Sequence, residues 1–122
     1  MPVVRIDITG PKSAEWKRAL LEGTRAAVVS GLGAPDGRVT VRVIETPDDC
    51  VDIPDCRTHD FTVIEVLMYE GRTAEMKQAF VARLRETLAA NPGIAPSEVT
   101  VLLRDYSRLD LDVLPGEAGA GS

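Results

Sequence analysis

The chain has 122 residues, 44% hydrophobic and 27% charged, which is enough for one packed domain and too few for two. Its 14 Lys and Arg residues against 19 Asp and Glu residues give a net charge of −5, which argues against nucleic acid or an anionic membrane as a partner. No apolar stretch approaches the ~20 residues of a transmembrane span, and the first residues lack the layout of a signal peptide, so we expect a cytoplasmic protein.

The first half of the chain predicts a strand, a helix and a second strand. Residues 3–8 alternate between apolar and charged side chains, as in a strand with one buried face. Ser13 is a suitable N-cap for a helix with apolar positions at helical spacing, namely Trp16, Leu20, Thr24, Ala27 and Val28. We expect Gly31 and Gly33 to end this helix, and residues 39–44 to form the second strand.

The second half repeats this order. Residues 61–69 and 99–103 are expected to be strands. Between them, Thr73 is a suitable N-cap, and residues 91–93 (Asn-Pro-Gly) give a stop signal for the helix. The apolar stripe of this helix is predicted to consist of Met76, Phe80, Leu84 and Leu88.

A displacement of 60 residues aligns the two halves, about 2–45 and 62–105. The longest matched block puts residues 12–21 on residues 72–81, so that Ser13 falls on Thr73. The same displacement also matches the first strand and the second strand of each half. One register for three separated blocks indicates a duplicated strand–helix–strand unit.

We therefore expect a single domain of residues 1–122, in which residues 46–60 join the halves and residues 115–122 form a loose tail. The predicted fold class is α/β (α+β), with a four-stranded mixed sheet and both helices on one face. The other face has no covering layer within the chain, and its residues include Val3, Arg5, Asp7, Val63, Glu65 and Leu67. Because a bare sheet face with apolar residues is normally covered, we expect further copies of the chain to cover it.

The two cysteines give a weak signal for a metal. Cys50 and Cys56 are expected to be free thiols in a reducing compartment. With Asp55 and His59 they suggest a zinc site, but the spacing matches no common zinc pattern, and a structural site needs four ligands. We therefore expect no metal.

Several segments resemble the tautomerase superfamily, which includes 4-oxalocrotonate tautomerase. They are Pro2 with the strand that follows it, the helix opening at residues 12–15, and Gly33-Ala34-Pro35 before the second strand. The internal repeat agrees, because longer members look like two fused copies of the short tautomerase unit. Residues 69–77 are similar to the second-half motif of the malonate semialdehyde decarboxylase and cis-3-chloroacrylic acid dehalogenase branches.

The resemblance implies a tautomerase fold that assembles as a homotrimer and acts on a small carboxylated keto or enol substrate. It also implies that Pro2 is the catalytic base and that no metal or organic cofactor takes part. Excision of Met1 would leave Pro2 as a secondary amine. The pKa of an α-amino group is ordinarily about 8. An apolar, cation-lined pocket lowers this pKa because it disfavours the charged ammonium form. The free amine can then move a proton on a carbon next to a carbonyl at neutral pH.

Three cations are implied as ligands of the substrate carboxylate. Arg72 matches the arginine that opens the second-half helix in several members, and its guanidinium can bind a carboxylate bidentately. Lys12 is the first-half equivalent, where the short tautomerases carry Arg. Arg42 lies on the second strand, two residues from the position of an arginine in the short tautomerases. Tyr69 and Tyr106 are candidate hydrogen-bond donors.

Departures from the family pattern favour tautomerisation over more specialised chemistry. Residues 68–70 lack the second cation of the decarboxylase and dehalogenase branches, and Glu70 would repel an anion. The candidate for the acidic residue of the decarboxylase loop is Asp36, but a gapless alignment puts Arg38, a basic residue, at that position. The alternatives are a decarboxylase, hydratase or dehalogenase of small three-carbon acids, a non-catalytic ligand-binding domain of the same fold, and a ferredoxin-like domain with antiparallel strand pairs.

Overall fold

The computed structural model describes residues 2–114, so the expectations for Met1 and for the tail 115–122 lie outside the described residues. Three short 3-10 turns, η1 (Asp36–Arg38), η2 (Asp48–Cys50) and η3 (Pro96–Glu98), accompany the main elements. The main elements are β1 (Val3–Thr9), α1 (Ala14–Leu32), β2 (Thr40–Thr46), β3 (Thr62–Tyr69), α2 (Ala74–Ala90) and β4 (Val99–Tyr106).

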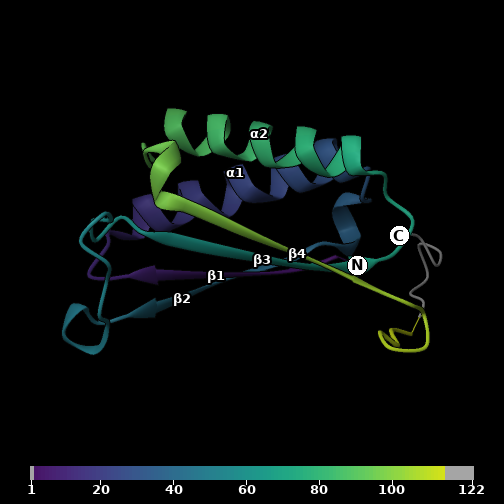
Figure 1. Cartoon of the computed structure of the whole chain (residues 1–122), viewed down its shortest axis with the longest axis horizontal. Helices are drawn as coiled ribbons and strands as arrows, with labels where there is room; N and C mark the ends of the chain where they lie inside the picture. Colours follow the sequence, from purple (N-terminus) through teal and green to yellow (C-terminus); the bar gives the residue numbers. More distant parts are fainter. Residues whose placement is uncertain (1, 115–122) are drawn as a thin grey trace.

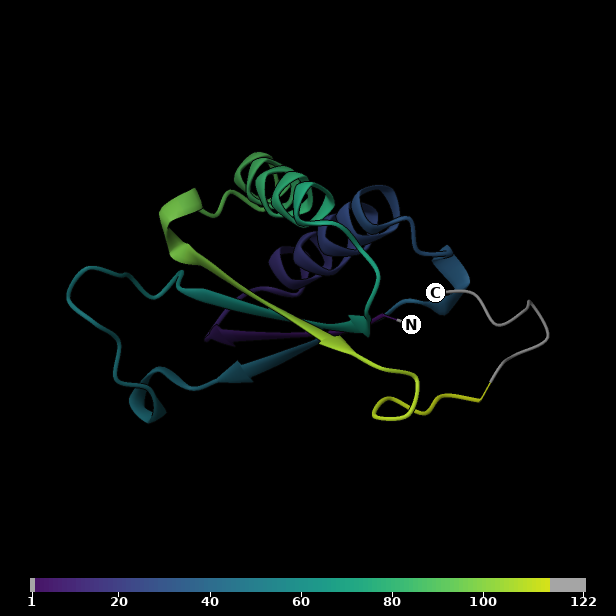
Figure 2. The same ribbon diagram turned by 45° about the vertical axis from the view of Figure 1, so that its right-hand side comes forward.

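The four strands form one mixed sheet in the order β2-β1-β3-β4. Strands β1 and β2 are parallel, β3 and β4 are parallel, and the central pair β1–β3 is antiparallel. Both helices lie side by side on one face of the sheet (Figures 1 and 2), as the sequence predicts. Because each half pairs its own strands in parallel, the ferredoxin-like alternative is wrong.

The internal repeat is visible in the hydrogen bonds as well as in the sequence. Each helix has a side-chain N-cap, because Ser13 Oγ accepts from the N–H of Trp16 and Thr73 Oγ1 accepts from the N–H of Met76, both at 3.1 Å. The ion pair of Lys17 with Glu45 likewise has an equivalent, in which both partners are displaced by 60 residues, between Lys77 and Asp105. The two halves are therefore copies of one unit, related by the antiparallel β1–β3 pair.

The core lies between the sheet and the helices. Alternate residues of β1 and β3 are buried, and they meet the helix residues predicted from the 3.6-residue period, with Leu20, Phe80, Leu84 and Leu88 all at 0% exposure. Met76 is an exception, since it is 38% exposed in the first turn of α2. No helix within residues 2–114 is long and apolar enough to cross a membrane.

Helix and strand ends differ from the sequence prediction by a few residues. Gly31 lies inside α1, against Phe80, and only Gly33 caps the helix, with a φ of 65°. The strand predicted from residue 39 starts at Thr40, because Val39 still donates its N–H to Asp36 of the preceding turn. Strand β4 extends to Tyr106 because each of its last residues pairs with β3, which the polar sequence there does not indicate.

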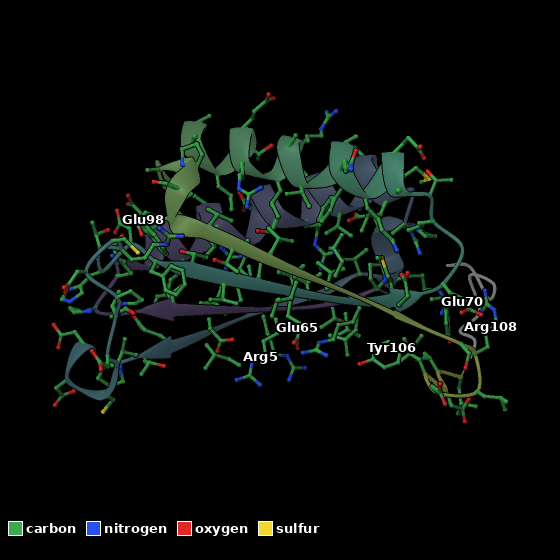
Figure 3. All side chains as sticks on the ribbon, in the orientation of Figure 1. Arg5, Glu65, Glu70, Glu98, Tyr106 and Arg108 are labelled. Atoms are coloured by element: carbon green, nitrogen blue, oxygen red, sulfur yellow. The ribbon has the colours of Figure 1, made fainter. Side chains whose placement is uncertain are left out.

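Within residues 2–114, no element covers the face of the sheet opposite the helices, as predicted. Figure 3 shows Arg5 and Glu65 projecting from this face, away from the helices. Arg5 binds Asp7 at 3.3 Å, and Arg104 binds Glu65 at 2.9 Å. We call this surface the bare face; its residues are Val3, Arg5 and Asp7 of β1, Thr40, Arg42 and Ile44 of β2, Val63, Glu65 and Leu67 of β3, and Thr100, Leu102, Arg104 and Tyr106 of β4.

Candidate functional site

Pro2 lies at the end of the sheet where β1 and β2 begin and β3 and β4 end (Figure 1). It is buried, and its carbonyl oxygen accepts a hydrogen bond from the N–H of Thr40 at 3.3 Å. The residue after it, Val3, pairs with both Thr40 and Leu67. The ladder therefore fixes Pro2 between two neighbouring strands, beside the chain reversals that follow β3 and β4.

Arg72 lies at the same end of the sheet, between β3 and α2. Its Nε donates to the carbonyl oxygen of Leu32 at 2.9 Å and its Nη1 to that of Tyr69 at 3.3 Å. Leu32 is the last residue of α1, where helix carbonyls lack partners within the helix. Burial lowers the pKa of Arg72, and the nearby Asp105 carboxylate acts in the opposite direction. Two carbonyls thus hold a half-buried guanidinium in place, and it stays charged at neutral pH.

A second arginine at this end was not identified from the sequence. The guanidinium of Arg108 stacks 4.1 Å from the ring centroid of Tyr69, a cation–π contact. Tyr69 is only 8% exposed, so its ring is packed against neighbouring residues. Tyr106 is its partner in β4 and lies on the bare face. Figure 3 shows Arg108, Tyr106 and Glu70 at the same end of the molecule, and the N–H of Glu70 donates to the carbonyl oxygen of Tyr106 at 2.9 Å. Arg108 could not be assigned to this end from the sequence, because its position depends on the pairing of Tyr69 with Tyr106. This pairing brings the segment after β4 to the end of β3.

The turn before β2 also faces this end, and it carries Asp36 and Arg38. Arg25 of α1 binds both the carbonyl of Asp36, at 2.8 Å, and its carboxylate, at 3.2 Å. Arg38 is half-buried and lies two residues before Thr40, the residue that binds Pro2. The carboxylate predicted as a decarboxylase acid is therefore paired with a helix residue.

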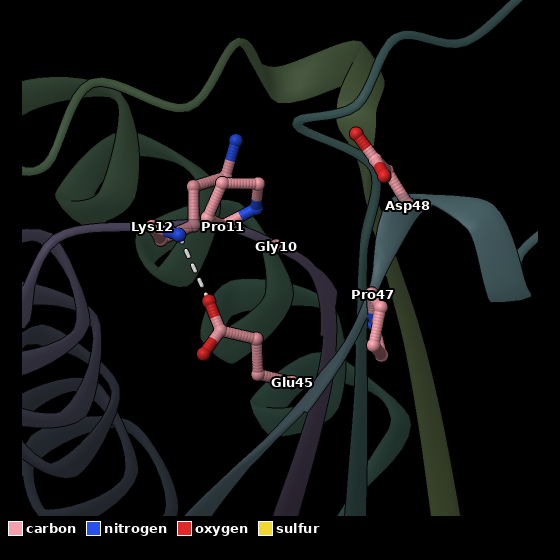
Figure 4. Close-up of a pocket in the computed structure, with 6 residues that line it drawn as sticks. All are labelled: Gly10, Pro11, Lys12, Glu45, Pro47 and Asp48. Atoms are coloured by element: carbon pink, nitrogen blue, oxygen red, sulfur yellow. Dashed lines mark hydrogen bonds between the residues drawn. The ribbon is translucent and has the colours of Figure 1, made fainter.

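Lys12 lies at the opposite end of the sheet from Pro2, because the whole of β1 separates them. Its Nζ binds the carboxylate of Asp60 at 2.7 Å, and its N–H donates to Glu45 at 2.8 Å. It borders a pocket of 290 Å³, drawn in Figure 4 and lined by Gly10, Pro11, Lys12, Glu45, Pro47 and Asp48. Within one chain, the fold does not bring Lys12 to Pro2.

Arg42 is the third predicted cation, and it points onto the bare face from the edge strand β2. It lies directly opposite Arg5 in the ladder, so two like charges face each other. Within residues 2–114 Arg42 has no hydrogen-bond or ion-pair partner. Its side chain and Arg72 therefore occupy different surfaces.

The two ends of the sheet differ in charge at two of three equivalent positions. Arg38, Arg72 and Arg108 at the Pro2 end correspond, after a displacement of 60 residues, to Glu98, Lys12 and Asp48 at the other end. Glu98 is only 6% exposed, and its carboxylate accepts from the N–H of Thr58 at 2.9 Å. The duplicated unit thus keeps three arginines at one end only, which suits that end to an anionic ligand.

The cysteines are free and exposed. Within the part of the chain that the structure describes, no group of three or more His, Cys, Asp and Glu side chains is arranged to hold a metal ion.

Comparison with known proteins gives consistent family and structure matches. Two family models described as tautomerase enzyme match residues 2–53 and 40–110. A search of curated proteins finds no significant match.

Three solved structures illustrate the fold match. The structure of Pt0534 inactivated by 2-oxo-3-pentynoate is 32% identical with a TM-score of 0.81, and the match covers 98% of this chain and 94% of that one. FG41 malonate semialdehyde decarboxylase inhibited by 3-bromopropiolate is 27% identical with a TM-score of 0.82 over 95% and 92% of the two chains. A wild-type fused 4-OT asymmetric trimer is 26% identical with a TM-score of 0.79 over 97% and 95%.

Proposed function

Because the chain belongs to the tautomerase family, we propose that it is a cofactor-independent enzyme that moves a proton on a small carboxylated keto or enol acid. The Pro2 amine is the general base. The observation that carries this proposal is the position of Pro2 at the one sheet end where three arginines lie. The substrate class and the cytoplasmic location stay predictions from the sequence.

The proposed reaction needs a free amine at Pro2, and therefore removal of Met1. The neutral amine takes a proton from the carbon next to the carbonyl and becomes an ammonium, while the electron pair moves onto the carbonyl oxygen to form an enolate. The ammonium then returns its proton to another carbon of the conjugated acid. The buried position of Pro2 supports this role, because an apolar surrounding disfavours the ammonium and keeps the amine unprotonated at neutral pH.

We assign Arg72 to the substrate carboxylate. Its guanidinium is held by the carbonyls of Leu32 and Tyr69, so it is pre-positioned and loses little freedom on binding. A partly desolvated arginine also attracts an anion more strongly than one in water. Lys12 can join this site only from another copy of the chain, because its own chain places it at the opposite sheet end.

We further propose that the protein is a homotrimer. The bare face is the observation that supports assembly, because its apolar residues have no layer over them within residues 2–114. The fused 4-OT relative described above is itself a trimer.

Decarboxylation or hydration of a three-carbon acid is the second candidate activity. The similarity to FG41 malonate semialdehyde decarboxylase favours it. Two features of the site weigh against it, because Asp36 is paired with Arg25 and no second cation precedes Arg72. A comparison of proton exchange and carbon dioxide release on the same 3-oxo acid distinguishes the two activities.

Covalent labelling tests the role of Pro2. We choose 2-oxo-3-pentynoate, which inactivates the relative Pt0534. A neutral amine adds to the alkyne without a leaving group, so the expected product gains the mass of one inhibitor, located by peptide mapping on the N-terminal peptide. A variant with an N-terminal extension has an amide at this position and should not react. Equal labelling of the extended protein would remove Pro2 from the mechanism.

A further inference from the structure

An acidic side chain, Asp105, lies near the arginine that we assign to the substrate carboxylate. Asp105 is opposite Met68 in the ladder of β3 and β4, and Arg72 follows β3 at the same end of the sheet. Burial lowers the pKa of Arg72, and the Asp105 carboxylate raises it, so the two charges interact across this end. A carboxylate in this position repels a substrate carboxylate and attracts the guanidinium that binds it.

Lys77 of α2 binds this carboxylate. Helix α2 begins at the end of the molecule where β4 finishes (Figure 1), and Lys77 lies near its start. Its Nζ makes an ion pair with Asp105, whereas no ion pair joins Asp105 to Arg72 within residues 2–114. Both side chains of the pair are partly shielded from water, so their charges are screened less than those of a fully exposed pair. Lys77 therefore neutralises the carboxylate beside Arg72.

The equivalent ion pair in the other half of the chain has different contacts. Glu45 accepts from Lys17 Nζ at 3.0 Å and also from the N–H of Lys12 at 2.8 Å. Asp105 is one methylene shorter, and in the part of the chain that the structure describes its carboxylate is held by Lys77 alone. The neutralisation of Asp105 therefore depends on one lysine, whereas that of Glu45 does not.

We propose that Lys77 is a positioning residue for the substrate: by binding Asp105, it prevents this carboxylate from repelling the substrate and from competing with it for Arg72. Lys77 acts through Asp105 and does not touch the substrate. Its loss therefore weakens the binding of an anionic ligand without slowing the reaction of the Pro2 amine. This inference rests on the proposed function, because it concerns the residue that binds the substrate carboxylate there.

The inactivation kinetics of 2-oxo-3-pentynoate separate binding from reaction. The inhibitor concentration that gives half the maximal inactivation rate reports binding of its carboxylate, and the maximal rate reports the reaction of the Pro2 amine. We expect Lys77→Gln to raise this concentration on the order of 3- to 10-fold and to change the maximal rate by less than about 2-fold. Because the cause is electrostatic, the difference from the wild-type protein should shrink as salt is added.

Two further variants keep the test independent of a general disturbance of the fold. Adding Asp105→Asn to Lys77→Gln removes the carboxylate that was left without its lysine, and should restore the half-maximal concentration of the wild-type protein. Asp105→Asn alone should bind the inhibitor at least as tightly as the wild-type protein does. Weaker binding in either variant would overturn the role of Lys77.

Lys17→Gln is the matched control, since it removes the equivalent lysine and the same charge at the opposite end of the sheet. It should leave both inactivation parameters unchanged. A rise in the half-maximal concentration equal to that of Lys77→Gln, or no rise in Lys77→Gln itself, overturns this inference and leaves Pro2 and Arg72 in their roles. A wild-type protein that the inhibitor does not label overturns the proposed function, and this inference with it.

Discussion

Arg72 and Lys12 are equivalent residues of the two halves, which makes them a matched pair for mutation. Loss of a charge-assisted pair costs about 1.5–3 kcal/mol, so Arg72→Ala should lower kcat/KM for a carboxylated substrate roughly 10- to 100-fold. Arg72→Lys should recover only part of this loss, because the two carbonyl contacts need the guanidinium fork.

Lys12→Ala decides whether the first-half cation reaches a site in another copy. A loss equal to that of Arg72→Ala would show that Lys12 acts across the assembly. An unchanged kcat/KM in Arg72→Ala would contradict the assignment of Arg72.

The pKa of Glu45 provides a test of the electrostatic contacts at the end of the sheet opposite Pro2. Its carboxylate accepts from Lys17 Nζ at 3.0 Å and from the N–H of Lys12, and the Lys17 contact is the larger cause that lowers its pKa. We expect an NMR titration to place this pKa below the ordinary value of about 4.3. Because the folded pKa is depressed, the stabilisation is present above the ordinary value and is lost as the pH falls through the folded one. In Lys17→Gln the pKa should rise towards the ordinary value, and an unchanged pKa would exclude this cause.

The contact between the two helices rests on a glycine of α1. A Cβ on Gly31 would lie 3.1 Å from Phe80 Cδ1 and 3.3 Å from Phe80 Cβ, and Phe80 is fully buried. Alanine is favoured over glycine inside a helix by about 1 kcal/mol, whereas overpacking of a core costs about 1–3 kcal/mol. We therefore expect Gly31→Ala to lower the free energy of unfolding by about 1 kcal/mol, measured with denaturant at fixed protein concentration.

Gly37→Ala is the control for this substitution. An added Cβ there meets nothing within 4 Å, and the residue lies in η1. Its effect should be close to zero or slightly stabilising. A gain in stability in Gly31→Ala would show that Phe80 can move aside.

The elements could be predicted from the sequence because local rules determine them. Side-chain caps at Ser13 and Thr73 start the helices, and apolar residues of period 2 and 3.6 mark the buried faces. The site could be predicted only in part, because strand pairing determines which loops meet. Arg108 reaches Tyr69 only through the register of β3 and β4. The separation of Lys12 from Pro2 could have been predicted from the sequence, because the seven residues of β1 lie between them. At about 3.3 Å each, these residues span roughly 23 Å.

The whole molecule should assemble through its bare face. Val63 is half-buried on this face in the central strand β3, where a glutamate would be desolvated on assembly but remain hydrated in a monomer. We expect Val63→Glu to sediment as a folded monomer at micromolar concentration, where we expect the wild-type protein to sediment as a trimer. Gln78→Glu, which makes the same charge change on the exposed side of α2, should leave the trimer intact. Persistence of the trimer in Val63→Glu would exclude the bare face as the interface.

The connection between β2 and β3 concentrates the negative charge of the molecule far from Pro2. Residues 47–60 carry five aspartates and one arginine, so they account for four of the five net negative charges. They lie beyond the far end of β1, more than two Debye lengths from Pro2 at physiological ionic strength, where that length is about 8 Å. An anion approaching the Pro2 end therefore experiences little repulsion from this connection. Most of the net acidity of this protein is therefore carried at a distance from Pro2, where it does not oppose an anion at the proposed site.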